Sequence, residues 1–231
     1  MANFTIFIVQ PKQWPHMRMF VEVAGALAHS LQKLGHEVSY NPGETSRIEN
    51  PVPRWGQGRS FGRCIIFGAH FLPDVPLPED AILWNLEQVP GNLGTAPETY
   101  DGAVMDEWLR SDFMKLIRRH VVWDYSQANI ARLRRLGVEG VVHCPIGYAP
   151  TLETVKPAAE DIDVLFFGTL GAGSRRERVL DHLQHTFDAK GQVTGVRTVR
   201  EADGTVRPIR VEALAGVYGA RRDEYIARAK V

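Results

Sequence analysis

Cysteine is scarce in this sequence: only Cys64 and Cys144 occur among 231 residues, and each sits inside an apolar run. Two cysteines cannot form a disulfide framework, so each is predicted to be a small buried hydrophobe in a reducing compartment. An excess of charge of either sign is also absent, since 27 Lys and Arg balance 27 Asp and Glu. The chain therefore lacks the electrostatic footprint of a protein that binds nucleic acid or an anionic membrane, and we predict neither partner.

Long apolar runs are missing as well. No uninterrupted apolar segment approaches the ~20 residues of a transmembrane helix. The apolar stretch over residues 4–9 has no basic segment before it, and Gln10 and Pro11 soon end it. This pattern predicts a strand rather than a signal peptide, and we expect a cytoplasmic protein.

Short apolar runs and helical stripes alternate through the first 150 residues, in a chain whose 44% apolar and 23% charged residues are typical of a soluble globular protein. Strands are predicted at residues 4–9, 36–40, 64–67, 81–86, 121–125 and 141–146. Helices are predicted at residues 17–34, 106–120 and 127–136, with Ser126 as an N-cap and with Gly35 and Gly137 as C-terminal residues. The alternation predicts an α/β domain with parallel strands over residues 1–150.

A polar segment, residues 151–161, predicts a linker, after which the pattern restarts. A strand is predicted over 162–167, a glycine-rich turn over 168–173, a helix over 174–187 and a last helix over 219–230. Between them, two β-rich arms flank Asp203-Gly204, which predicts a β-hairpin insertion.

The second domain, residues 162–231, is expected to be partial, because an α/β repeat needs another strand after its last helix. An incomplete sheet leaves an unpaired edge and exposed apolar surface. A partner chain or a second copy of this chain is therefore predicted to cover it.

Residues able to do chemistry follow the strands of the first domain at their carboxyl ends, where open α/β sheets bind ligands. Trp14 and His16 follow the first strand, His70 the third, and Asn85 and Glu87 the fourth. A neutral imidazole can act as a general base near pH 7, and a carboxylate can accept a proton or a sugar hydroxyl. Alternatively, Trp14 packs over the helix start, His16 caps the helix or is solvated, and Glu87 is an exposed or arginine-paired loop residue.

The glycine-rich turn is a candidate phosphate site. Its glycines, Gly168, Gly171 and Gly173, precede a helix N-terminus, and Arg175 and Arg176 could neutralise a phosphate there. The spacing is not G-x-G-x-x-G and no Walker lysine follows, so a tight turn with solvated arginines is the alternative.

Several motifs of other enzyme classes are missing: G-x-S-x-G, H-E-x-x-H and C-x-x-C do not occur. His182 and His185 are three residues apart on an expected helix but have no third ligand at a recognisable spacing. The residues therefore predict no metal site.

Four segments, taken in order, resemble glycosyltransferases of the GT-B fold. They are AGALAHSLQKLGHEV (24–38), VVWDYSQANIARLRRLGV with VVHCPIGYAP (121–138 and 141–150), DIDVLFFGTLGAGSRRERVLDHL (161–183) and GVYGARRDEYIARAKV (216–231). The resemblance implies two Rossmann-like domains and transfer of a sugar from a nucleotide-sugar donor to an acceptor hydroxyl. It implies no metal ion and no cofactor, because many members stabilise the leaving diphosphate with basic side chains and a helix dipole.

The resemblance also assigns roles. The acceptor would lie near His16, His70 and Glu87, with His16 and Glu87 as catalytic residues and Trp14, His70 and Asn85 as substrate-binding residues. His16 would be the base if the reaction inverts configuration, whereas a reaction that retains configuration needs no protein base. The donor diphosphate would meet the turn and the helix start, at Gly168, Thr169, Gly171, Gly173, Arg175 and Arg176.

One departure from the family concerns the donor site. The family places acidic donor-site residues further along the second domain than Val231, where this sequence ends. Two other hypotheses therefore remain beside the transferase. One is a non-catalytic binding or scaffold protein of the same fold, favoured by the short second domain. The other is a Rossmann-type enzyme such as a sugar-nucleotide epimerase, disfavoured by the missing G-x-G-x-x-G.

Overall fold

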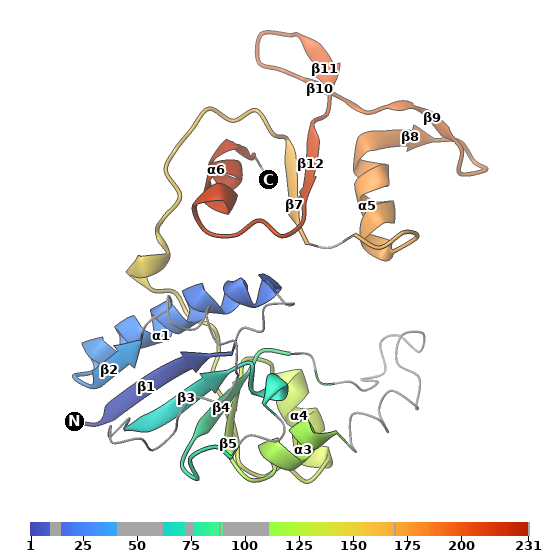
Figure 1. Cartoon of the computed structure of the whole chain (residues 1–231). Helices are drawn as coiled ribbons and strands as arrows, with labels where there is room; N and C mark the ends of the chain where they lie inside the picture. The colour runs from blue at the N-terminus through green and yellow to red at the C-terminus, as the bar shows by residue number, and fades with distance from the viewer. Residues whose placement is uncertain are drawn as a thin grey trace. The chain divides into compact units, whose positions relative to one another are not determined.

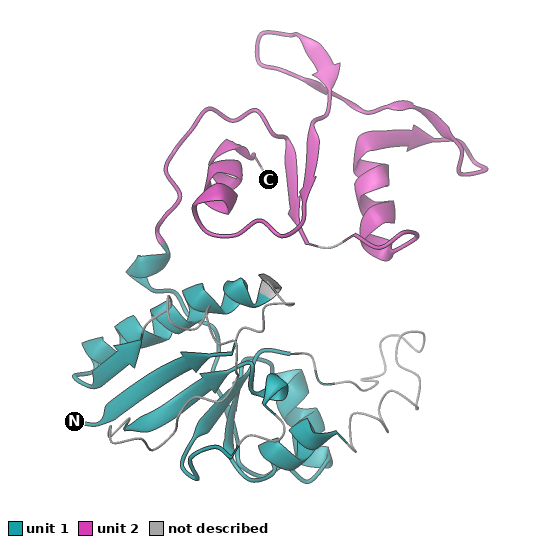
Figure 2. Cartoon of the chain, in the orientation of Figure 1, with its two compact units in different colours: residues 1–152 teal, residues 153–231 magenta. Residues whose placement is uncertain are grey.

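The computed structural model describes residues 1–9, 15–40, 62–72, 76–87, 89, 111–168 and 170–230, with the side chains of residues 15 and 16 excepted. The chain divides into two compact units, Met1–Leu152 and Glu153–Val231 (Figure 2). Among the described residues, every helix is too short or too polar to span a membrane.

A six-stranded parallel sheet forms the centre of unit 1 (Figure 1). Its strands are β1 (Asn3–Ile8), β2 (Glu37–Tyr40), β3 (Arg63–Phe67), β4 (Ile82–Asn85), β5 (Val121–Asp124) and β6 (Val141–His143), in the order β2-β1-β3-β4-β5-β6. Every neighbouring pair is parallel, with registers such as Ile65↔Ile82 and Asn85↔Asp124. The α/β class with parallel strands predicted from the sequence is confirmed.

Helices cover both faces of this sheet (Figure 1). They are the 3-10 turns η1 (Pro15–Met19), η3 (Ala69–Phe71) and η4 (Pro150–Leu152), and the helices α1 (Phe20–Lys33), α3 (Asp112–Ile117) and α4 (Gln127–Arg135). Phe20, Ala24 and Leu31 of α1 pack in one core cluster, and residues of α3 and α4, including Met114 and Leu133, pack in the other. Burying each large apolar side chain contributes about 1.5–3 kcal/mol, so the two clusters supply the main stabilisation of unit 1.

Local signals in the sequence explain where the helices of unit 1 begin and end. The Ser126 hydroxyl accepts a hydrogen bond from the Asn129 amide and caps α4, as predicted. Gly35 and Gly137 follow α1 and α4 with φ of 81° and 77°, the left-handed region that glycine enters without a steric cost. Strand β6 ends at His143 rather than at residue 146 as predicted, and Pro145, which has no N–H to donate, follows closely.

Unit 2 contains three two-stranded sheets and two helices in its described part. Strands β7 (Val164–Phe167) and β12 (Val211–Leu214) are parallel, and β8 (His185–Phe187) with β9 (Val193–Val196) and β10 (Thr198–Arg200) with β11 (Val206–Pro208) are antiparallel. The helices are α5 (Arg175–Gln184) and α6 (Ala220–Arg228). After α6, Ala229 forms a parallel bridge with Ile162, just before β7.

The structure corrects two predictions for unit 2. The helix predicted to reach residue 187 ends at Gln184, because the next residues form β8. The Arg197 guanidinium also donates hydrogen bonds to the carbonyls of His182 and His185. The hairpin about Asp203-Gly204 is confirmed as β10–β11, but it is shorter than predicted. Its outer arms pair elsewhere, with β9 on β8 and β12 on β7.

Charged side chains hold unit 2 together at the amino end of β7. The buried Asp163 carboxylate accepts hydrogen bonds from the Arg207 guanidinium at 2.6 and 2.8 Å and from the Lys230 ammonium at 3.1 Å. Nearby, Asp161 pairs with Arg210 and Arg228. The hydrogen bond from Arg228 is the main reason that the pKa of Asp161 falls to about 2, and the one from Arg207 likewise depresses the pKa of Asp163. These contacts tie β7 to the hairpin and to the residues after α6.

Candidate functional site

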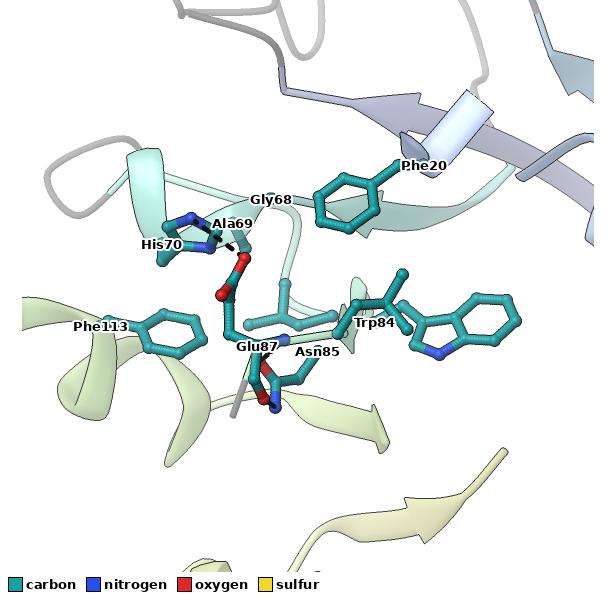
Figure 3. Close-up of a pocket in the computed structure, with 10 residues that line it drawn as sticks. Phe20, Gly68, Ala69, His70, Trp84, Asn85, Glu87 and Phe113 are labelled. Carbon is teal, nitrogen blue, oxygen red and sulfur yellow. Dashed lines mark hydrogen bonds and ion pairs between the residues drawn. The ribbon is translucent and has the colours of Figure 1, made fainter. Parts of the chain in front are cut away.

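A pocket opens at the carboxyl ends of β3 and β4 in unit 1 (Figure 3). Proteins with this strand order bind ligands at that edge of the sheet, next to the point where the order reverses between β1 and β3. The wall contains a turn from the end of β3, the segment that follows β4, and one aromatic residue each from α1 and α3. The lining residues are Phe20, Gly68, Ala69, His70, Leu83, Trp84, Asn85, Leu86, Glu87 and Phe113.

His70 reaches the pocket because β3 ends in a tight turn. Gly68 has φ of 74° and begins the single 3-10 turn that carries the imidazole. A Cβ on Gly68 would lie 3.0 Å from the Val9 carbonyl oxygen and 3.1 Å from the Met17 Cε, so only glycine fits there without displacing its neighbours. The His70 ring packs against Phe113, with ring centroids 5.8 Å apart in an edge-to-face arrangement.

Glu87 lies across the pocket from His70 and points its carboxylate toward the imidazole (Figure 3). The His70 Nε2 and the Glu87 Oε1 are 4.0 Å apart. Both side chains reach solvent, with exposed fractions of 24% for His70 and 46% for Glu87. An imidazole and a carboxylate that follow the adjacent parallel strands β3 and β4 thus meet beside the Phe113 ring, where a ligand hydroxyl could contact either.

The segment that carries Glu87 is held by side-chain amides. The Glu87 amide donates to the Asn85 Oδ1 at 3.3 Å, and the Glu87 carbonyl accepts from the Asn85 Nδ2 at 3.0 Å and from the Asn129 Nδ2 at 2.9 Å. Two residues further, the Val89 amide donates to the Asn129 Oδ1 at 3.1 Å, and Arg132 donates to the Val89 carbonyl. The backbone on both sides of residue 88 is therefore satisfied without forming regular structure.

Asp124 lies beneath this segment, at the end of β5, with no exposed surface. Its carboxylate accepts from the Asn85 Nδ2 at 2.7 Å, from the Ser126 amide at 2.8 Å and from the Asn129 Nδ2 at 3.3 Å. Burial raises the pKa of the Asp124 carboxyl, and the hydrogen bonds from Asn85, Ser126 and Asn129 oppose the rise. The Ser126 amide that donates to Asp124 belongs to the residue that caps α4, so Asp124 also fixes the chain at the start of that helix.

The structure thus brings together three of the residues predicted for the first domain: His70, Asn85 and Glu87. Asn85 is 6% exposed and its amide bonds to Glu87 and Asp124, so it supports Glu87 from below. Trp14 lies outside the described residues. The backbone of His16 belongs to η1, but its side chain is not among those described.

Sequence reasoning missed Asn129 and Phe113 as parts of this site. Asn129 is the third residue of α4, where an amide side chain is a poor helix former. That local mismatch was the available signal for a tertiary role. Phe113 carried no such signal, since an apolar residue on a short helix is expected to be buried in any fold.

The glycine-rich turn of unit 2 joins β7 to α5. Gly168 and Gly173 have φ of 144° and 72°, and Ser174 caps α5 by accepting from the Glu177 amide at 3.2 Å. The Glu177 carboxylate accepts from the Gly173 amide at 2.5 Å, so an acidic side chain of the helix itself occupies a donor that a phosphate would use. Thr169 lies outside the described residues.

The two arginines predicted for the phosphate site are exposed at the start of α5. The Arg176 Nη1 would be 3.8 Å from a Cβ built on Gly168, so this guanidinium lies over the turn. Arg175 and Arg176 are thus near the turn, as the sequence predicts, while their binding to a phosphate remains a prediction.

Within the described ranges, no group of three or more His, Cys, Asp or Glu side chains has a geometry that could hold a metal ion. Comparison of the chain with protein-family models, with curated proteins and with solved structures finds no match. Arguments about function therefore depend on the site itself.

Proposed function

We propose that this protein is a glycosyltransferase of the GT-B type, which binds its acceptor in the pocket at the carboxyl ends of β3 and β4. The observation that carries the proposal is the pair of His70 and Glu87, 4.0 Å apart beside the Phe113 ring. Aromatic faces bind the apolar side of a sugar or a similar hydroxylated ring, and a carboxylate beside them can accept a hydroxyl proton.

The reaction that fits this pair is an inverting transfer. The Glu87 carboxylate takes the proton of the acceptor hydroxyl as its oxygen forms a bond to the anomeric carbon of the donor sugar. The bond from that carbon to the phosphate oxygen breaks, and the nucleoside diphosphate leaves with the electron pair. His70 orients the hydroxyl between its own ring and Glu87, which supplies the proximity that such a step needs. In this proposal Glu87 is the base, and the role of His16 stays a prediction from the sequence.

Unit 2 supports the donor half of the proposal. A parallel strand, a glycine turn and a helix start follow one another from β7 to α5, with Arg175 and Arg176 exposed at the turn. Amide groups at a helix N-terminus together with guanidinium groups suit a diphosphate. A bound diphosphate would replace the Glu177 carboxylate on the Gly173 amide.

The test is transfer from a panel of nucleotide sugars to glycan and small-molecule acceptors, measured as released nucleoside diphosphate. Glu87→Gln keeps the shape of the side chain but removes its basicity, so we expect turnover to fall by about 10²–10⁴-fold, the usual contribution of a general base. Glu139→Gln is the matched control, because Glu139 is an exposed glutamate at the opposite edge of the same sheet, before β6. Full turnover by Glu87→Gln would contradict the role of Glu87.

A non-catalytic binding protein of the same fold is the second candidate. The contact that favours it is the one from Glu177 to the Gly173 amide, which neutralises the phosphate-binding end of α5 within the chain. The same panel separates the two candidates. An acceptor that binds and raises the unfolding temperature, with no diphosphate released from any donor, favours the binding protein.

A further inference from the structure

Two asparagines bind one short stretch of backbone, from Glu87 to Val89, through both ends of their side-chain amides. Asn85 bonds to both the N–H and the C=O of Glu87, and Asn129 bonds to the Glu87 C=O and the Val89 N–H. Asn85 comes from β4 and Asn129 from α4, 44 positions apart in sequence numbering (129 − 85). The backbone that carries the Glu87 side chain is thus held by side chains from two other elements, β4 and α4.

Asp124 anchors both amides in the orientation that the backbone also requires, because the Glu87 carbonyl only accepts and the N–H groups of Glu87 and Val89 only donate. An ionised carboxylate can only accept hydrogen bonds, so each asparagine must turn its NH2 group toward Asp124. The bonds from the Asn85 Nδ2 at 2.7 Å and the Asn129 Nδ2 at 3.3 Å follow this rule. Each Oδ1 is then free to receive a backbone amide, from Glu87 in one case and from Val89 in the other.

The free-energy cost of burying the Asp124 charge also indicates that this residue has a role beyond stabilising the fold. Asp124 is fully buried, and the donors that reach its carboxylate here are two amide side chains and one backbone N–H, all of them neutral. The imidazole of His143 also favours the ionised form, but burial has the larger effect and the pKa of Asp124 stays raised, so this buried charge is expensive compared with an apolar residue of similar volume. A group that only stabilised the end of β5 would be better replaced by such an apolar residue.

We propose that Asp124 and Asn129 are positioning residues, which hold Glu87 opposite His70: Asn129 binds the backbone of Glu87 and Val89, and the buried Asp124 carboxylate anchors the NH2 groups of Asn85 and Asn129. The inference rests on the proposed function only in calling Glu87 the group that acts on substrate. Asn129 acts through the backbone of Glu87 and Val89, and Asp124 acts through the side chains of Asn85 and Asn129.

The deciding variant is Asp124→Asn, which has nearly the same shape but carries one NH2 group in place of an oxygen. That group faces the NH2 of Asn85 or of Asn129, so that asparagine meets a donor where it had an acceptor, and its amide is pushed away from the backbone of Glu87 and Val89. We expect amide hydrogen exchange at Glu87 or Val89 to accelerate about tenfold, the loss of one hydrogen bond. Asn129→Ala should accelerate exchange at Val89 by a similar factor. Ile130→Val, a neighbouring core change on α4 without a polar atom, should accelerate neither.

Two further readouts report on Glu87 itself. In both positioning variants the NMR resonances of the His70 ring should move in the same direction as in Glu87→Gln, because each variant displaces the carboxylate from the imidazole. Turnover should fall with little change in KM, and adding Asn129→Ala to Glu87→Gln should lower it no further, as expected for residues that act as a unit.

The outcomes separate this inference from the proposed function. Unchanged exchange at Glu87 and Val89 with unchanged His70 resonances in both variants would overturn the positioning role, whatever the activity. Altered exchange and resonances would support it even if Glu87→Gln keeps full turnover, a result that would overturn only Glu87 as the base.

Discussion

The two units of this chain contrast in what holds them together. Unit 1 has a six-stranded parallel sheet between two apolar clusters, and three of its described buried polar residues, Asn85, Asp124 and Asn129, gather at the carboxyl edge. In the described part of unit 2, the buried apolar residues are Ile162 and Leu180 alone, beside the buried carboxylates of Asp163 and Asp223. Apolar burial therefore dominates in unit 1, and charged hydrogen bonds carry a much larger share in unit 2.

This contrast bears on the proposed function. In unit 1, the deep core leaves polar residues at the sheet edge free to serve a site, and a buried Asp124 can be tolerated for the sake of geometry. In unit 2, the charges at the amino end of β7 serve the fold itself, at the other end of the strand from the glycine turn. The two units are thus expected to respond differently to mutation and to pH.

The largest effect is expected from a core truncation in unit 1. Phe67 has no exposed surface and packs between Phe20 and Trp84, with ring centroids 6.1 and 4.9 Å away. Phe67→Ala should destabilise unit 1 by about 3–5 kcal/mol, because it leaves a cavity in a closely packed cluster. Urea unfolding followed by tryptophan fluorescence measures this, since the tryptophans are all in unit 1. They are residues 14, 55, 84, 108 and 123.

The comparison for that variant is Leu180→Ala, which truncates a buried residue of α5 in unit 2. It should leave the fluorescence transition in place. A shift of that transition as large as the one for Phe67→Ala would show that the two units do not unfold separately.

A smaller effect is expected from Asp163→Asn in unit 2. The variant removes the charge that Arg207 and Lys230 share, and charged hydrogen bonds contribute about 1.5–3 kcal/mol each. We expect a loss of about 2–3 kcal/mol, seen as faster hydrogen exchange throughout unit 2 with unit 1 unchanged. Asp188→Asn, at an exposed turn of the same unit, is the control. Equal stability of Asp163→Asn and the wild type would refute the importance of charge in unit 2.

The smallest expected effect is a pH dependence of opposite sign in the two units. In unit 2, Asp161 has a pKa of about 2, and the pKa of Asp163 is also depressed. As the pH falls below about 3.9, the usual pKa of an unfolded Asp, the unfolded chain therefore binds protons before the folded chain does. Acid thus destabilises this unit. In unit 1, the raised pKa of Asp124 means that the folded state binds its proton first. Its contribution to stability therefore rises as the pH falls through that raised pKa toward the unfolded value.

Both signs can be isolated with single variants, because other carboxylates titrate in the same range. Asp163→Asn should flatten the acid-induced loss in unit 2, and Asp124→Asn should remove the acid-induced gain in unit 1. Hydrogen exchange measured over a pH series, with the wild type subtracted, checks both. Identical slopes in wild type and variants would show that these groups do not control the pH response.

Much of the fold could be predicted because its signals are local. The apolar runs at β1, β3, β4 and β5 and the stripe of α1 need only the spacing of side chains along the chain. Ser126, Gly35 and Gly137 set helix ends through their own hydrogen bonding or dihedral freedom. The Asp203-Gly204 hairpin is of the same kind.

The predictions of secondary structure were wrong where a segment could pair with more than one strand. Residues 185–187 have no local feature that ends a helix, yet they form β8 because residues 193–196 lie alongside. In the same way, the residues of β12, predicted as part of a hairpin arm, pair with β7 instead. Such choices depend on which distant strand is available, and that is invisible in a single sequence.

The candidate site also has features that local signals predict and features that depend on distant contacts. By itself the sequence determined the alternation that builds a parallel sheet, and with it the edge where His70, Asn85 and Glu87 emerge, because side-chain periodicity and strand direction are properties of the chain. Only the tertiary structure decided that His70 and Glu87 face each other. It also decided that Asn129 binds the backbone of Glu87 and Val89, and that Asp124 anchors the side chains of Asn85 and Asn129. Hydrogen bonds between residues about 40 positions apart form only after the strands have paired, so no local pattern encodes them.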